Sequence, residues 1–128
     1  MAWREDQKQQ VWKRAIIVEG YDKNRFRKDA CGAWIIWEKF GDNDSLYGWE
    51  IDHIVPRALL EEKGYSQKDI DNYDNLRALQ HENNASKSDD YPSYTAVVTS
   101  EGVENVNVTK YLEVNQKKQA ILKKLYNL

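Results

Sequence analysis

The sequence predicts an α+β fold with an N-terminal helix, a central strand–loop–strand–helix unit, and a C-terminal β-hairpin followed by a helix. Three observations lead to this prediction. Apolar residues recur at helical spacing in residues 5–18 and 115–126, short β-branched and aromatic runs are bounded by turn residues, and residues 47–88 read as strand, loop, strand and helix. A chain of 128 residues fits a single domain spanning residues 1–128.

The first half of the chain is expected to form a helix and two strands. Gly20 provides the stop for the first helix, and bulky apolar residues between turn signals are typical of strands. In chain order we expect a helix at 5–18, a polar connection at 21–29, a strand at 33–37, a turn at 41–45, and a returning strand at 47–55 that forms a hairpin with 33–37.

The second half begins where Pro56 ends the strand at 47–55. Ser66 and Asn115 have side chains that can accept backbone N–H bonds, so each is predicted to cap a helix. In chain order we expect a helical turn at 57–63, a capped helix start at 66–69, a strand at 75–79, a helix at 80–88 closed by 89–92, a hairpin from strands at 95–99 and 103–108, and a final helix after Asn115.

Composition describes a globular chain. Hydrophobic residues make up 41%, charged residues 31%, and there are two prolines, which argues against disorder. With Cys31 as the single cysteine, an internal disulfide and a four-thiolate zinc site are excluded. Cys31 is predicted to be a small residue of the buried core. We see no signal-peptide core and no stretch near the roughly 18 apolar residues that span a bilayer, so we expect a cytoplasmic protein with no membrane partner.

The charge distribution is uneven. A net charge of −2 and a pI near 5.7 are not the profile of a strong non-specific nucleic-acid binder. Residues 1–28 carry eight basic and four acidic groups, residues 29–92 carry six and fourteen, and residues 93–128 carry five and three. An acidic middle between basic ends suits a cation-binding centre with phosphate-holding flanks, although ordinary surface solvation also produces such runs.

The most informative residues are Asp52 and His53 at the end of the predicted strand. Neighbouring side chains on a regular strand point to opposite faces, so both can serve one site only if the strand bends before Pro56. With that bend, Asp52 is predicted to bind a divalent cation and His53 to act as the general base that activates a water for phosphodiester hydrolysis.

Asn84 is predicted to be the second metal ligand. Carboxylate and amide oxygens suit magnesium better than zinc, with manganese or another divalent metal as alternatives. Lys87 lies three residues later on the same helical face and is a candidate contact for substrate phosphate. Asn75 is grouped with the catalytic residues as a structural support whose amide bonds the loop backbone.

Two further basic residues and two polar residues have open roles. Arg27 and Lys28 are predicted to bind substrate phosphate, and a plain solvated basic loop is the alternative. His81 and Glu50 could act as accessory ligands, but we favour packing or hydrogen-bonding roles for both.

These motifs carry a resemblance to a known family. Asp52-His53, Asn75, Asn84 and Lys87, in this order, resemble the HNH, or ββα-metal, endonucleases. The runs at 52–56 and 84–89 are similar to the HNH domain of RNA-guided CRISPR nucleases, and the wider segment resembles small bacterial and phage HNH proteins.

The resemblance implies a ββα-metal core at about 47–94 and magnesium-dependent cleavage of DNA, with Asp52 and Asn84 on the metal and His53 as base. Two departures from the family pattern stand out. Many members have histidine where Asn84 stands, which bears on metal preference. Many also have two Cys-x-x-Cys pairs that this chain lacks, so packing that includes Trp34 and Trp37 must replace a zinc brace.

Two other classes of function stay open. One is a nucleic-acid-binding or assembly module that keeps the fold without turnover, and the other is a toxin-like effector nuclease held by an inhibitor. The expected partner is DNA, and a homodimer or a phage or bacterial protein partner is left open.

Overall fold

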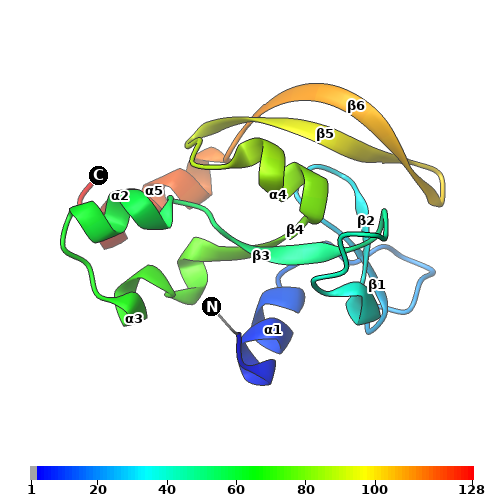
Figure 1. Ribbon diagram of the computed structural model, residues 1–128, viewed down its shortest axis with the longest axis horizontal. Helices are drawn as coiled ribbons and strands as arrows, with labels where there is room; N and C mark the ends of the chain where they lie inside the picture. Colours follow the sequence, from blue (N-terminus) through cyan, green and yellow to red (C-terminus); the bar gives the residue numbers. More distant parts are fainter. Residues whose placement is uncertain (1–2) are drawn as a thin grey trace.

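The computed structural model describes residues 3–128 and shows a mixed α+β chain (Figure 1). Its strands form antiparallel two-stranded sheets: β1 (Phe26–Lys28) with β2 (Trp34–Ile36), β3 (Trp49–His53) with β4 (Leu76–Gln80), and β5 (Ser93–Glu101) with β6 (Glu104–Glu113). The α-helices are α1 (Glu5–Trp12), α2 (Arg57–Glu62), α3 (Gln67–Ile70), α4 (His81–Lys87) and α5 (Gln116–Tyr126), with 3-10 turns η1 (Trp37–Lys39) and η2 (Tyr73–Asn75).

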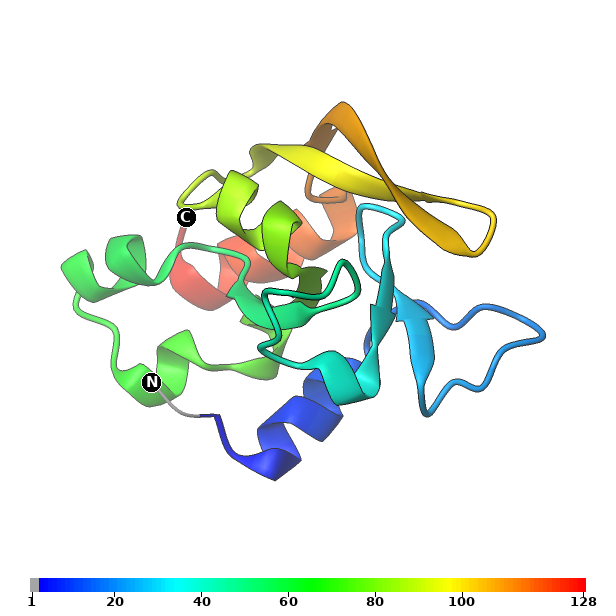
Figure 2. The ribbon, with the colours of Figure 1, turned by 45° about the vertical axis from the view of Figure 1, so that its right-hand side comes forward.

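The β3–β4 hairpin lies at the centre of the molecule. Helix α1 packs against one of its faces and α4 against the other, and the long β5–β6 ribbon covers α4 from outside (Figures 1 and 2). Helix α4 follows β4 without a loop, because Gln80 ends the strand and its Oε1 accepts the backbone N–H groups of Glu82 and Asn83. The chain thus places a helix directly on the hairpin that precedes it.

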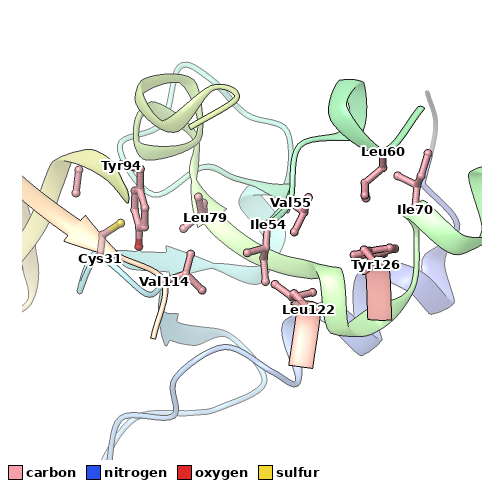
Figure 3. Close-up of a cluster of buried hydrophobic side chains, with 11 residues drawn as sticks. Cys31, Ile54, Val55, Leu60, Ile70, Leu79, Tyr94, Val114, Leu122 and Tyr126 are labelled. Carbon is pink, nitrogen blue, oxygen red and sulfur yellow. The ribbon is translucent and has the colours of Figure 1, made fainter. Parts of the chain in front are cut away.

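Two hydrophobic clusters hold these layers together. The first fills the space between α1 and the hairpin face that carries Trp49 and Ile51; its buried members are Val11, Trp12, Ile35, Trp49, Ile51, Leu76 and Ala78. The second packs α5 against the segment that follows β3 and against β5 (Figure 3); its buried members are Cys31, Ile54, Val55, Leu60, Ile70, Leu79, Tyr94, Ala96, Val114, Leu122 and Tyr126. The hairpin is therefore fixed from several sides.

The predicted helix caps are confirmed. Ser66 Oγ accepts the N–H of Asp69 at 3.2 Å, and Asn115 Oδ1 accepts the N–H of Lys118 at 2.7 Å. Each bond satisfies one of the donors that a helix leaves unpaired in its first turn. Cys31 is buried, as predicted.

The predicted partner of the 33–37 strand is wrong. Strand β2 pairs with β1, which lies in the stretch expected to be a polar connection, and β3 pairs with β4. The first helix also ends at Trp12, six residues earlier than predicted. The cause is tertiary, because Ile16 leaves the helix to exchange two backbone hydrogen bonds with Lys28 at 2.9 and 3.0 Å.

The C-terminal hairpin and helix are present as predicted, although β5 and β6 are longer than the sequence indicated and contain a register shift between Ala96 and Val98. Over residues 3–128, none of the helices has the length and apolar character needed to cross a bilayer.

Candidate active site

Five of the predicted site residues lie around the end of β3, on two different faces of the hairpin: Asp52, His53, Asn75, Asn84 and Lys87. Glu50 and Asp52 alternate with Trp49 and Ile51, so the two carboxylates point away from the tryptophan-rich core and toward α4. The register places Asp52 opposite Arg77 on β4.

Asp52 is bound by two cationic side chains. Arg77 Nε donates to Asp52 Oδ2 at 3.1 Å, and Lys87 Nζ lies 3.3 Å from Asp52 Oδ1. Lys87 Nζ also donates to the backbone carbonyl of His53 at 3.2 Å. Asp52 is only 4% exposed and Lys87 is 0% exposed, so this is a buried ion cluster. Lys87, predicted to meet substrate phosphate, here meets Asp52.

Burial and attraction compete in this cluster. Burial disfavours the charged ammonium and lowers the pKa of Lys87, with Asp52 offsetting part of that effect. Burial is also the largest single influence on Arg77 and acts in the same direction, but the charge of Asp52 and the contacts with Tyr94 together outweigh it and raise the pKa of the guanidinium. Arg77 also lies 4.9 Å from the ring centre of Tyr94. Its Nη2 is buried and has no hydrogen-bond partner among residues 3–128.

Asn84 lies on the same side of the hairpin as Asp52 and contacts the carboxylate of Glu50. Its Nδ2 donates to Glu50 Oε1 at 3.2 Å, which leaves the amide oxygen for a further ligand. Because Glu50 and Asp52 are alternate residues of one strand, Asn84 and Lys87, one helical turn apart, reach neighbouring carboxylates. The hydrogen-bonding role favoured for Glu50 is therefore observed.

His53 lies on the opposite face. Its Nε2 is 2.7 Å from Asp71 Oδ1, and its ring centroid is 5.5 Å from that of Trp3. The bend predicted before Pro56 is present, but it comes after His53 and does not turn the two side chains to one face. Strand β3 stays regular through His53, which pairs with Leu76, and the bend follows at residues 54–55. The carboxylate and the imidazole therefore leave consecutive residues in opposite directions.

A pocket of about 700 Å³ lies beside the His53–Asp71 pair. Asp71 is one of its lining residues, and Arg4, Arg14 and Lys68 contribute positive charge to its walls.

Asn75 fastens the loop that connects the two strands. Its Oδ1 accepts the N–H of Val55 at 2.7 Å, and its Nδ2 donates to the carbonyls of Val55 and Ile70 at 3.2 and 3.1 Å. The side chain is 0% exposed. This is the loop-backbone bonding that the sequence predicted for Asn75.

The remaining predicted residues lie away from this centre or make structural contacts. The Arg27 guanidinium is buried, and its Nε and Nη1 donate to the carbonyls of Lys23, Lys13 and Ala15 in the N-terminal segment. Lys28 Nζ lies 4.8 Å from the ring centre of Trp34. His81 Nε2 is 2.9 Å from the Ser45 carbonyl, which fits the packing role favoured for it.

Two residues of the site were missed by the sequence analysis. Arg77 would have been found if the sequence had given the residue-by-residue register of β3 and β4, because that register places it opposite Asp52. Asp71 lies between a four-residue helix and a 3-10 turn, and no periodic pattern marks it as the partner of His53.

Oxygen atoms that could act as metal ligands lie on one side of the hairpin. Within the described part of the chain, no three His, Cys, Asp or Glu side chains gather to form a metal cage. Asp52, Glu50 and Asn84 nevertheless offer oxygen ligands on one side of the hairpin, of the kind that magnesium prefers. The positive charges of Lys87 and Arg77 already balance the negative charges of Asp52 and Glu50. A divalent cation therefore fits this charge balance only if the Lys87 ammonium withdraws from Asp52.

Comparison with known proteins gives no relative: no family model, no curated protein and no solved structure matches this chain. The arrangement of residues around β3 therefore has to support any functional assignment.

Proposed function

We propose that this protein is a divalent-metal-dependent endonuclease of the HNH, or ββα-metal, type that hydrolyses phosphodiester bonds in DNA. One observation carries the proposal. At the end of β3, Asp52 points its carboxylate toward α4, the helix that carries Asn84. The next residue, His53, has its imidazole 2.7 Å from the carboxylate of Asp71. The succession of antiparallel hairpin and packed helix in β3, β4 and α4 supports the ββα-metal assignment.

Asp52 and Asn84 would hold the ion, with magnesium or manganese as the metals that match their oxygen atoms. When bound, the ion supplies neutralisation of charge on the phosphoryl oxygens and on the departing oxygen. Lys87 and Arg77 each place a positive charge against one oxygen of the buried Asp52, and Lys87 would withdraw when the ion binds. Glu50 holds the amide of Asn84 and so orients its oxygen.

His53 takes the proton from the attacking water. A positioned general base contributes about 10²- to 10⁴-fold to the rate of such reactions. Although Asp52 and His53 point to opposite faces, the only strand that pairs with β3 at this end, among the residues the structure describes, is β4. We therefore place the substrate phosphate at the outer edge of β3, between the two side chains.

A plasmid-cleavage assay tests the proposal. Wild-type protein should nick or linearise supercoiled DNA with Mg²⁺ or Mn²⁺ and stop in EDTA. His53→Ala and Asp52→Asn should abolish cleavage. His81→Ala is the matched control, because it removes the other histidine, which bonds a loop carbonyl, and it should cut like wild type.

Failure of folded wild-type protein to cut with any divalent metal would contradict the proposal. Binding of DNA in a gel-shift assay without cleavage would then favour the alternative, a binding or assembly module.

A further inference from the structure

We infer that Asp71 is the positioning residue of the proposed nuclease: it holds the His53 imidazole through Nε2–H, so that Nδ1 is the nitrogen that receives the proton of water. This inference rests on the proposed function. It adds a residue and a specific ring nitrogen that the motif does not contain.

The first support is the geometry of the pair. His53 Nε2 and Asp71 Oδ1 are 2.7 Å apart, and the two side chains are 15% and 12% exposed. A carboxylate accepts hydrogen bonds and cannot donate one when ionised, so the proton between them belongs to Nε2 and the neutral ring keeps its lone pair on Nδ1. No other described residue bonds the ring nitrogens, so Nδ1 is available to a water.

The second support is that Asp71 is itself held in place. Its Oδ2 accepts from Gln67 Nε2 at 2.7 Å, and Gln67 Oε1 accepts from Arg57 Nη2 at 3.1 Å. Gln67 and Asp71 are four residues apart, at the start and the C-cap of α3, so they share one helical face. The carboxylate therefore enters the pair with its second oxygen already fixed.

The third support is the clamp made by Asn75. It bonds Val55, two residues after His53, and Ile70, the residue before Asp71. One buried amide thus fixes the separation of the two segments that carry the pair. Such support of a reacting group by a bonded second residue is what keeps a catalytic side chain in its productive geometry.

In the reaction, an O–H bond of the attacking water breaks as an N–H bond forms at His53 Nδ1. The resulting imidazolium is stabilised by the Asp71 carboxylate. The oxygen of the water bonds to phosphorus, the P–O bond to the leaving oxygen breaks, and the leaving oxygen departs with the bonding electrons and takes a proton from solvent.

The test is an NMR measurement of the imidazole ¹⁵N shifts of the full chain in alkaline buffer, where the ring is neutral, without metal. Wild type should show the Nε2–H tautomer at His53. Asp71→Asn keeps the shape but adds an amide donor, and should shift His53 toward the Nδ1–H tautomer. Asp69→Asn is the matched control: Asp69 is an exposed carboxylate on the same short helix, and this variant should resemble wild type.

Kinetics complete the test. Asp71→Asn should lower kcat about 10²-fold or more with little change in KM, because it removes orientation of the base and not substrate contact. An unchanged tautomer in Asp71→Asn, or a kcat equal to that of Asp69→Asn, would overturn the role of Asp71 while leaving an active nuclease. A wild-type protein that cuts no DNA would overturn the proposed function and this role together, even if the tautomer behaves as expected.

Discussion

Lys87→Met removes the fully buried ammonium from the Asp52 cluster and keeps a side chain of similar length. The ammonium lies 3.3 Å from Asp52 Oδ1, so the direct attraction is about 5 kcal/mol at an effective dielectric constant of about 20. Burial of Lys87 opposes this attraction, which is why its pKa is lowered. Arg77 remains to balance Asp52, so we expect the lower end of the usual cost of breaking a buried pair, about 3 kcal/mol.

Urea denaturation followed by tryptophan fluorescence measures this loss. Lys117→Met, on the exposed face of α5, is the matched control and should stay within about 0.5 kcal/mol of wild type. Asp52→Asn combined with Lys87→Met should cost less than the sum of the two single changes, by about 1–3 kcal/mol. If Lys87→Met unfolds at the same urea concentration as Lys117→Met, the buried cluster does not stabilise the fold as reasoned here.

Three further outcomes follow from the structure. Asn83→Ala deletes a buried amide that makes four hydrogen bonds, to the β5 backbone and to a buried carboxylate. It should lower the free energy of unfolding, measured by chemical denaturation, by about 3 kcal/mol or more. The control is Asn84→Ala, which loses one hydrogen bond and should cost under about 1 kcal/mol. Burial raises the pKa of Tyr126 to about 12. The stability that its neutral hydroxyl contributes is therefore complete below the unfolded-state pKa of about 10 and is lost as pH rises toward about 12. Tyr126→Phe should show a shallower alkaline decline in stability than wild type, and an identical slope would contradict this. Lys87→Met should also bind Mn²⁺ about tenfold more tightly than wild type by calorimetry, because no ammonium competes for Asp52, whereas weaker binding would show that Lys87 does not oppose the metal.

Local features of the fold were predictable because they depend on residues close in sequence. The caps at Ser66 and Asn115 are side-chain geometries set within three residues of each helix start. The shared face of Asn84 and Lys87 follows from helical spacing, and the order strand, strand, helix around them follows from apolar runs and turn residues.

The pairing of strands was not predictable in the same way. Strand β1 has only Phe26 as an apolar residue, and it is anchored by the buried Arg27 guanidinium, which bonds three carbonyls that are 4 to 14 residues away in sequence. A short polar strand stabilised by such distant acceptors leaves no periodic pattern, so the sequence indicated a connection there.

The partners of the site residues depend on tertiary structure as well. Helical spacing places Lys87 beside Asn84 but does not say that its ammonium meets Asp52, 35 residues earlier in the chain. Strand alternation gave the correct warning that Asp52 and His53 face apart. The expected bend before Pro56 is present at residues 54–55, but β3 keeps its pairing with β4 through His53, so the bend does not bring the two side chains to one face.

Binding of Mn²⁺, measured by electron paramagnetic resonance on the full chain, tests most directly whether Asp52 and Asn84 share one divalent ion. We expect one bound ion per chain in wild type, strongly weakened binding in Asp52→Asn and in Asn84→Ala, and unchanged binding in His53→Ala. Absence of bound Mn²⁺ in wild type, or equal binding in Asp52→Asn, would contradict a metal centre at the end of β3.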